Sequence, residues 1–597
     1  MNAPPREQHA RITHGDATFL CEQGLRIWRF YAEFGTEKHN YLIPDNVEEE
    51  GLFEAARVST TNIGMLLNAR QAAAEFGFIT VPEFAELTRR TLDSVHQLEK
   101  LNGHPYNWYD TLTLAPLTPI TVSSVDNGNL AASLYTLRAG AVAMLKLPVL
   151  HPRLFTGLRT HWKLMLLQKD IPREIASHKL PKTGASDDEW IAWCLGAQML
   201  DGFSQQSELT GEAAWWLRET HNRIQAINQL VREYRPWLLP EFAPLRAIPQ
   251  LGLSLETPIS PATASDFGVQ LEARLDRMWA TSIDPAYSVL CEQLRTLLAE
   301  SIVRQRTLNA SLRAIADDGF HLADQMDFSF LLEKSRLLLS IGYEVANQKL
   351  HTATYDMLAS EARIATFLAV AKGDIPQQCW FKLSRTHTIA FNRPVLLSWT
   401  GTMFEYLMPS LWMRSYPDTL VARTLQAAVE IQRDYGRRHN IPWGISEAGY
   451  AEQDPAGHYH YQAYGIPEMA LKWDATAGPV VSPYSSFLAL GTDAPSAMKN
   501  LRRMAKAGWV GAYGFYESVD YSQTGGQAKL VREWMAHHQG MSLLAILNLL
   551  NDNIVQTWFH SNPQLQATEL LLHEKPMREA ALRAEYKLFA PKARRTA

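Results

Sequence analysis

The stretch Trp443-Gly444-Ile445-Ser446-Glu447-Ala448-Gly449-Tyr450 presents a carboxyl group on a constrained loop between two aromatic side chains. It follows a helical pattern that ends near Arg438, and Pro442 prevents a further helical turn. Gly444 permits backbone dihedral angles that other residues avoid. An aromatic ring can stack on a sugar, and a carboxyl group can act on a glycosidic bond. The loop therefore suits a sugar-binding site, although an ordinary connection between helices can have the same composition.

On both sides of this loop, amphipathic helical patterns alternate with polar loops that contain aromatic and acidic residues. Helices are predicted over residues 19–34, 61–74, 82–101, 130–146, 355–372, 406–413, 419–438 and 531–550. Strand patterns are weak, and the short apolar run 394–399 fits either one strand or a buried loop. Helical pairs repeated over several hundred residues predict an all-α fold of the α/α toroid type.

The middle of the chain has a different pattern. Residues 152–324 are helical but lack the aromatic and acidic loops, and their helical runs cover 187–202, 210–234 and 270–316. Residues 236–267 are rich in proline and predicted to be irregular. We therefore expect three parts: 17–151 as the first part of the toroid, 152–324 as a helical insertion, and 325–580 as the remainder. The insertion is expected to supply neither catalytic carboxyl group.

The composition excludes several classes of protein. With 597 residues, 46% hydrophobic and 20% charged, the chain can bury a large core and is not globally disordered. A net charge of −5 without a basic block argues against nucleic acid as a partner. The chain has no signal peptide pattern and no apolar run of the ~18 residues that a membrane span needs. Its four cysteines form no CxxC pair, so we expect reduced thiols and a cytoplasmic location.

Seven segments combine carboxyl groups or histidines with aromatic or amide side chains: 107–110, 126–129, 355–363, 399–405, 443–450, 514–521 and 537–540. Each alone has an ordinary explanation. Asp126 or Glu361 could cap a helix, and Glu405 or Glu517 could pair with an arginine. Because a toroid brings the loops between its helices to one end of its axis, we predict that the seven segments form one polar, aromatic-lined cavity.

Other chemistries fit the sequence poorly. There is no HExxH motif, and we do not expect the adjacent His537 and His538 to present both rings on one helix face, so no metal or other cofactor is predicted. Gly525-Gly526 lacks the strand, lysine and serine of a phosphate-binding loop, and no GxSxG nucleophile motif occurs. A pair of carboxyl groups acting on a glycosidic bond remains.

Together these segments resemble a known family. The matching motifs are 59–64 (STTNIG), 106–111 (YNWYDT), 122–130 (VSSVDNGNL), 355–363 (YDMLASEAR), 397–406 (LSWTGTMFEY), 443–450 (WGISEAGY), 514–521 (GFYESVDY) and 535–542 (MAHHQGMS). From about residue 20 to residue 576, the chain resembles the glycoamylase-like transglycosylating (cyclisation) domain of cyclic β-1,2-glucan synthases. That domain forms glycoside hydrolase family 189 and is related to the endo-β-1,2-glucanases of family 144.

The resemblance implies an (α/α)6 barrel that acts on linear or cyclic β-1,2-glucan. It carries the family's catalytic glutamates onto Glu447, which we expect to be the nucleophile, and Glu361, which we expect to be the acid/base. The remaining motif residues are expected to bind substrate: Asn107, Tyr109, Asp110, Asp126, Asn127, Asn129, Tyr355, Asp356, Arg363, Trp399, Glu405, Trp443, Tyr450, Tyr516, Glu517, Asp520, His537, His538 and Gln539.

The chain also departs from the family. It has no counterpart of the membrane-bound glycosyltransferase and phosphorylase domains of the synthases, so we expect it to cut or rejoin chains rather than to elongate them. Glu447-Ala448-Gly449-Tyr450 stands where the synthases more often have Ser-Ala-Tyr after the glutamate. The sequence leaves transfer, cyclisation and hydrolysis open. It also leaves open an inverting endo-β-1,2-glucanase and a glucan-binding module without turnover.

Overall fold

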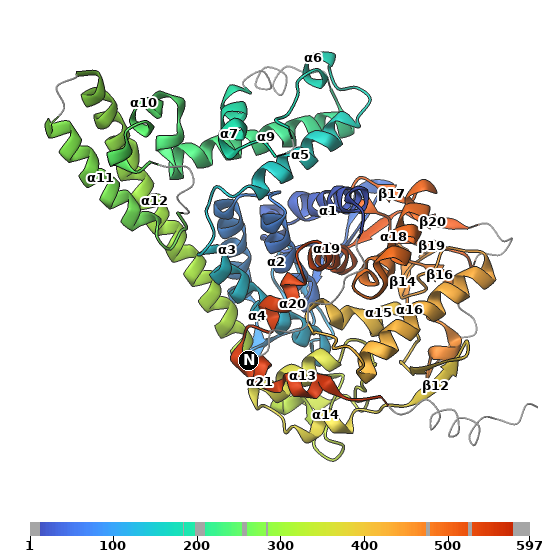
Figure 1. Ribbon diagram of the computed structural model, residues 1–597. Helices are drawn as coiled ribbons and strands as arrows, with labels where there is room; N and C mark the ends of the chain where they lie inside the picture. Colours follow the sequence, from blue (N-terminus) through green and yellow to red (C-terminus); the bar gives the residue numbers. More distant parts are fainter. Residues whose placement is uncertain are drawn as a thin grey trace, which may run out of the picture. The chain divides into compact units, whose positions relative to one another are not determined.

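The computed structural model describes residues 12–576, apart from residue 183 and residues 198–208, 254–258, 282–284, 473–477 and 523–527 (Figure 1). The chain forms two compact units. The first contains the described residues of Met1–Ala69, Asp93–Thr136 and Phe320–Ala597, and the second contains those of Arg70–Leu92 and Leu137–Gly319.

Within the described part of the first unit, six helices form an inner set. They are α2 (Thr60–Glu75), α4 (Ser124–Met144), α13 (Arg363–Lys372), α15 (Met403–Leu407), α17 (Pro483–Leu488) and α19 (Ala536–Leu550), of which α2 and α4 end in the second unit. Five of them follow β3 (Arg57–Ser59), β7 (Thr121–Ser123), β13 (Arg393–Leu396), β16 (Val480–Val481) and β21 (Glu533–Met535). The chain thus enters these helices through similar loops.

Close packing joins four of these helices: α2, α4, α13 and α19. The Asn68 side chain of α2 donates a hydrogen bond to the Ser133 carbonyl of α4 over 3.0 Å. Gly128 of α4 lies so near α13 that a Cβ atom there would be 2.7 Å from the Cβ of Ala365. A Cβ atom on Gly540 of α19 would be 2.7 Å from a side chain of α2. Glycine permits each of these two close approaches between helices.

Side-chain contacts complete the ring. Arg363 of α13 donates a hydrogen bond to the Tyr406 carbonyl of α15 over 3.0 Å. The rings of Phe404 on α15 and Tyr484 on α17 lie 6.5 Å apart. Tyr484 stacks on His538 of α19 at 3.7 Å. The order α2–α4–α13–α15–α17–α19 therefore closes on itself, with every helix entered from the same end.

A second set of helices covers this ring. In the first unit, α1 (His14–Phe34) packs on α19, α16 (Leu420–His439) on α15 and α18 (Leu490–Lys506) on α17 (Figure 1). The Tyr31 hydroxyl of α1, for example, donates to the Ala536 carbonyl over 2.5 Å. An inner ring with outer helices is an (α/α)6 barrel, so the predicted all-α class is confirmed. The remaining elements of this unit include α14 (Gln378–Lys382), α20 (Ile554–Phe559) and α21 (Pro563–Thr568).

The strands are short, antiparallel and confined to the loops. The sheets are β2 (Phe53–Glu54)–β1 (Asn46–Glu48)–β21, β11 (Lys349–Leu350)–β10 (Gly342–Glu344)–β7, β16–β19 (Ser518–Asp520)–β20 (Lys529–Val531), β12 (His387–Ala390)–β13, β14 (Ala448–Gln453)–β15 (Tyr459–Gln462), β17 (Val510–Gly511)–β18 (Gly514–Phe515), β3–β6 (Trp108–Asp110), β4 (Lys100–Leu101)–β5 (His104–Pro105) and β8 (Leu332–Glu333)–β9 (Leu338–Leu339). They fix the loops from which the inner helices start.

The second unit is helical. It contains α5 (Arg153–Leu166), α6 (Arg173–Ala176), α7 (Asp187–Gly196), α9 (Gly211–Tyr234), α10 (Ala243–Arg246), α11 (Ala264–Thr281) and parts of α3 (Val81–Gln97) and α12 (Pro285–Asp324). Arg223 of α9 forms an ion pair with Glu83 of α3 at 2.8 Å. The boundaries 17–151, 152–324 and 325–580 stay predictions about domain organisation, and residues 577–580 lie outside the described residues.

Several predicted helices have different bounds. The helix predicted over 355–372 begins only at Arg363, because Ser360 adopts a positive φ of 50° and turns the chain. The first residues of 531–550 are strand instead, since β21 pairs with β1. The run 270–316 is two helices, α11 and α12, and 197–202 falls largely outside the described residues. No helix among the residues described is both long and apolar enough to cross a membrane.

Candidate active site

Glu361 is a buried carboxyl group at the entrance to α13. The turn at Ser360 sets its direction, and the Ser360 hydroxyl donates a hydrogen bond to one carboxyl oxygen. Asn129, in the second turn of α4, donates its side-chain amide to the other oxygen over 2.6 Å. Two neighbouring inner helices thus hold this carboxyl group.

Asp126 lies beside Glu361, in the first turn of α4. It accepts hydrogen bonds from Thr61 over 2.7 Å and Ser123 over 2.6 Å. Thr61 in turn accepts one from Asn129, which connects Asp126 to Glu361. Burial and the charge of Asp126 raise the pKa of Glu361 to about 7, although the hydrogen bonds to the carboxyl oxygens oppose this shift. Asn107 also donates to Asp126 over 3.1 Å in the amide orientation that satisfies both of its neighbours.

Glu447 lies on the loop that the sequence singled out. Gly444 has a φ of 125°, and a Cβ atom at this position would collide with the Ser485 hydroxyl. The Tyr484 hydroxyl donates to the Glu447 carbonyl over 2.9 Å and contacts the Ser446 hydroxyl at 2.7 Å. The main chain of Glu447 is therefore fixed by α17, the inner helix next to α15 in the ring.

The Glu447 carboxyl group lies among other acids. Burial, followed by the charges of Glu405 and Glu361, raises its pKa well above the usual range, and Glu517 adds to the effect. A hydrogen bond with the Tyr461 side chain acts in the opposite direction. Charges that affect one another in this way are close in space. The structure thus brings Glu361 and Glu447 together from distant parts of the sequence.

Two aromatic side chains border the pair. Burial raises the pKa of Tyr355 well above the usual range, and the charges of Asp126, Glu361 and Glu447 add to this effect. The Tyr355 ring packs against Trp399 with 5.6 Å between the ring centres. Neither ring is fully buried, so both have surface available for a sugar.

Glu405 near Glu447 has a structural role as well. Its side chain accepts hydrogen bonds from Ser398 over 2.7 Å and from the backbone of Thr400 and Thr402 in a capping box at the start of α15. Burial nevertheless raises its pKa. Glu405 is therefore tied to the helix start while its charge acts on Glu447.

Glu517 and His538 form a buried pair with 2.8 Å between Oε1 and Nδ1. Burial raises the pKa of Glu517 to about 8 and lowers the pKa of His538 well below its usual range. Glu517 also accepts a hydrogen bond from the Gly449 amide over 3.3 Å, two residues beyond Glu447. The pair therefore supports the strand that follows the Glu447 loop.

His537 and His538 correct one sequence-based expectation. Their ring centres lie 4.1 Å apart, and they lie 6.2 and 6.0 Å from that of Tyr461. Both rings thus lie near the same residue, and both belong to the first turn of α19. Among the described residues, no group of three or more His, Cys, Asp or Glu side chains is arranged to hold a metal ion.

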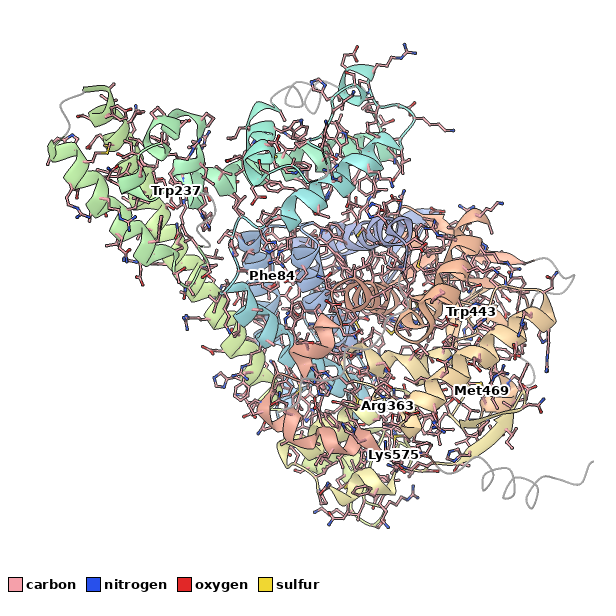
Figure 2. The ribbon with its side chains drawn as sticks, in the orientation of Figure 1. Phe84, Trp237, Arg363, Trp443, Met469 and Lys575 are labelled. Carbon is pink, nitrogen blue, oxygen red and sulfur yellow. The ribbon has the colours of Figure 1, made fainter. Side chains whose placement is uncertain are left out.

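The other predicted site residues make contacts that shape the surrounding loops. Hydrogen bonds connect Tyr109 to Glu99 O, Asp110 to Leu112 N, Asn127 to Pro105 O, Asp356 to Met357 N, Arg363 to Tyr406 O, Trp443 O to Asn500, Tyr450 to Gly478 O, Tyr516 to Glu49, Asp520 to Ala451 N and Gln539 to Phe515 O. Arg363 and Trp443, labelled in Figure 2, are almost completely buried. These ten residues are thereby tied to other loops and helices of the first unit.

The sequence analysis missed Thr61, Ser360, Tyr461 and Tyr484 as site residues. Thr61 and Ser360 lie inside quoted motifs and could have been chosen for their hydroxyl groups. Tyr461 stands in the run Tyr459-His460-Tyr461-Gln462, which carries no loop motif. Only the pairing of Gly449 with Tyr461 between β14 and β15 brings this side chain near Glu447.

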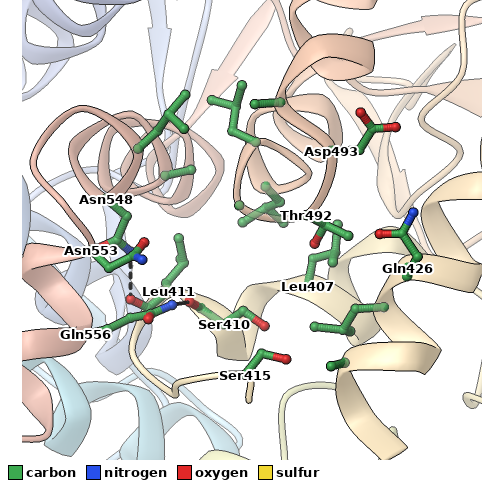
Figure 3. A pocket seen from close by; sticks show the side chains of 18 of the residues that line it. Leu407, Ser410, Leu411, Ser415, Gln426, Thr492, Asp493, Asn548, Asn553 and Gln556 are labelled. Atoms are coloured by element: carbon green, nitrogen blue, oxygen red, sulfur yellow. Dashed lines mark hydrogen bonds between the residues drawn. The ribbon is translucent and has the colours of Figure 1, made fainter. Parts of the chain in front are cut away.

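A cavity of about 610 Å³ lies elsewhere in the first unit (Figure 3). It is lined by the last residues of α15, α17 and α19, and so lies at the opposite end of these helices from the carboxyl groups. Figure 3 shows the Asn548 side chain hydrogen-bonded to the Leu411 carbonyl at its edge. Asp493, the carboxyl residue that lines it within the described residues, is bound to Arg433 at 2.7 Å. This cavity lacks the paired acids of the other end.

Known proteins resemble this chain in sequence and fold. The Glycoamylase family model matches residues 354–563, which include both Glu361 and Glu447. The chain carries a glycoamylase-like domain. The glycoamylase-like chain is also 33% identical over 576 residues, 94% of its length, to the cyclic β-(1,2)-glucan synthase NdvB of Rhizobium meliloti. It spans only 18% of the length of that synthase.

Solved structures share the fold of this glycoamylase-like chain. A Talaromyces funiculosus endo-β-1,2-glucanase variant in complex with β-1,2-glucan has a TM-score of 0.56 at 11% identity and covers 94% of this chain and 90% of its own. The Chitinophaga pinensis endo-β-1,2-glucanase has a TM-score of 0.51 at 11% identity, with 94% and 99% covered. At these identities the likeness shows a common helical barrel.

Proposed function

We propose that this chain is a glycoside hydrolase or transglycosylase that acts on β-1,2-glucosidic bonds in linear or cyclic β-1,2-glucan. The observation that carries the proposal is the meeting of Glu361 and Glu447 at one end of the helix ring. The 33% identity to a cyclic β-(1,2)-glucan synthase supports the choice of substrate. Because the chain spans a small part of that synthase, its own reaction has to be tested directly.

In the proposed reaction, a Glu447 oxygen attacks the anomeric carbon while Glu361 gives its proton to the leaving glycosidic oxygen. The carbon–oxygen bond breaks and a glucosyl ester forms on Glu447. Glu361, now ionised, takes a proton from an acceptor hydroxyl, whose oxygen attacks the same carbon and releases Glu447. A pKa of about 7 suits a group that gives and then takes a proton near neutral pH.

Neighbouring side chains have proposed roles in binding. Tyr355 and Trp399 offer ring surface for a glucose unit. Asp126 and Asn107 can accept and donate hydrogen bonds to sugar hydroxyls at the margin of the pair. The residues discussed here all lie outside 152–324, which we propose to be a helical insertion that supplies neither carboxyl group.

Incubation of the chain with linear β-1,2-glucan tests the proposal. The products are sized by mass spectrometry and their reducing ends are counted. New reducing ends mean hydrolysis, whereas rings or longer chains without new reducing ends mean transfer. Binding without any product would contradict catalysis and leave a glucan-binding module.

Proton NMR of the first product distinguishes two mechanisms. Retention gives the β-anomer first and requires the covalent step on Glu447, whereas an inverting endo-β-1,2-glucanase gives the α-anomer first. Azide should restore turnover to Glu447→Ala but not to Glu361→Ala when Glu447 is the nucleophile, because the small anion can occupy the space of the lost carboxylate. The opposite pattern would reverse the two roles.

A further inference from the structure

The loop after Glu447 continues into a hairpin that returns to the same carboxyl group. Strand β14 begins at Ala448, and β15 pairs with it so that Tyr461 stands opposite Gly449. From there the Tyr461 side chain hydrogen-bonds to the Glu447 carboxyl group. The exposed fraction of Tyr461 is 39%, so its ring also borders open space. The hairpin therefore places a phenol on the Glu447 carboxyl group.

Three acidic side chains face Glu447, so a nearby hydrogen-bond donor affects its ionisation. Glu405 reaches it from α15, Glu361 from the turn before α13, and Glu517 from the loop after β18. All three disfavour a negative charge on Glu447. Burial and the charges of Glu447, Glu517 and Asp45 raise the pKa of Tyr461 well above the usual range, so Tyr461 stays protonated and can donate its hydrogen bond. A donor is what an ionised carboxylate in such surroundings needs.

The far end of the hairpin is anchored to the β1–β2 region. His458 stacks on Phe53 with 3.8 Å between ring centres, and its Nδ1 lies 3.3 Å from the Glu48 carboxyl group. The Tyr459 amide donates to the same carboxyl group over 3.4 Å. Glu48 itself is buried in the strand that pairs with β21. The turn of the hairpin is thus held in place near the start of α19.

We propose that Tyr461 is a positioning residue whose hydroxyl orients the Glu447 carboxyl group and favours its ionised form, and that the anchor at Phe53, His458 and Glu48 keeps Tyr461 in place. The inference rests on the proposed function of Glu447. It assigns a role to strand β15, which the motifs do not include. It also explains why the catalytic loop and the hairpin are continuous in the chain.

The variant Tyr461→Phe removes the hydroxyl but keeps the ring. Loss of the hydrogen bond should raise the pKa of Glu447, so the limb of the kcat/KM profile that reports Glu447 should move to higher pH by about one unit. When Glu447 works as the carboxylate this is the acidic limb, and kcat at low pH should fall about tenfold with little change in KM. Tyr459→Phe, on the same strand, serves as the matched control and should leave the profile unchanged.

The variant Phe53→Ala tests the anchor. It should move the same limb in the same direction by a smaller amount, because the hairpin remains attached through Glu48. Neither limb moving in Tyr461→Phe, with an active parent, would overturn the inference. Movement of the alkaline limb would contradict the ionised role of Glu447.

A measurement without turnover separates this inference from the proposed function. Glutamate labelled with ¹³C at the carboxyl carbon allows Glu447 to be titrated by NMR, with Glu447→Gln assigning its signal. The pKa of Glu447 should be higher in Tyr461→Phe than in the parent. An unchanged value would overturn the inference, whereas inactivity of a parent that shows the expected titration difference would count against the proposed function alone.

Discussion

The two ends of the helix ring in the first unit consist of the same helices but differ in how their polar groups are satisfied. At the end where the helices start, burial raises the pKa of Glu361, Glu405 and Glu447, and the charges of Glu405 and Glu361 raise that of Glu447 further. At the other end, Asp493 is neutralised by Arg433, and the Asn548 side chain donates to a main-chain carbonyl. The comparison indicates that the first end holds groups in unfavourable states, which is typical of catalytic sites.

Helix direction contributes to this difference. The inner helices begin at the end of the ring that holds these carboxyl groups, and helix N-termini carry a partial positive charge. The C-terminal ends of α15, α17 and α19 line the cavity, where apolar side chains lie beside neutral amide and hydroxyl groups. The ring therefore concentrates acids where the helix ends tolerate negative charge.

The largest expected effect is a difference in kcat between variants at the two ends of the ring. Glu361→Gln and Glu447→Gln should each lower kcat for β-1,2-glucan by about 10³-fold or more, because each amide has nearly the same shape but cannot transfer a proton or attack carbon. Asp493→Asn makes the same chemical change at the other end and should retain activity within about threefold. Steady-state kinetics with folded protein, checked by circular dichroism, measure this contrast. Equal losses of kcat at both ends would mean that activity does not depend specifically on the end that holds Glu361 and Glu447.

The second prediction concerns the charge of Asp126. Because that charge raises the pKa of Glu361, Asp126→Asn should lower the pKa of Glu361. With Glu361 as the protonated acid, activity is lost as the pH rises through its pKa, so the alkaline limb should move to lower pH. A shift of about one unit is expected for a charge at this range. The measurement is kcat/KM between pH 4 and pH 9. A shift of the alkaline limb to higher pH would mean that the charge of Asp126 does not raise the pKa of Glu361.

The sequence predicted part of this end of the ring and missed another part. Motifs around Glu361 and Glu447, together with a toroid, were enough to expect both in one cavity. The positive φ of Ser360 that aims Glu361 has no sequence signature, since serine rarely adopts it. The position of Tyr461 depends on hairpin register, a property of pairing between strands rather than of local pattern. Arg363 lies in a motif and joins two inner helices through its hydrogen bond to the Tyr406 carbonyl, whereas Trp443 is held through its main-chain carbonyl by Asn500.

The third prediction concerns stability at the catalytic end. The pKa of Glu361 in the folded chain is about 7, above its ordinary value of 4.5, so the stability contributed by this group is lost as the pH rises through about 7. Glu361→Gln removes the ionisation and should melt roughly 2–4 °C higher than the parent at pH 8. At pH 5, where the parent is protonated, the two should differ little. Differential scanning fluorimetry at both pH values measures the difference. A lower melting temperature at pH 8 would show that the ionised form is well accommodated.

The smallest effect is expected at the neutral end. Gln556 on α20 donates its side-chain amide to the Ser410 carbonyl over 2.7 Å, at the margin of the cavity. Gln556→Ala removes this bond and should lower the free energy of unfolding by about 1 kcal/mol, because the freed carbonyl can reach water in the cavity. Urea unfolding followed by tryptophan fluorescence measures this change. Activity on β-1,2-glucan should remain within about twofold of the parent, since Gln556 lies at the end of the helices away from Glu447. A large loss of activity with a small loss of stability would mean that the two ends of the ring are coupled, and that the neutral cavity influences the carboxyl pair through the helices between them.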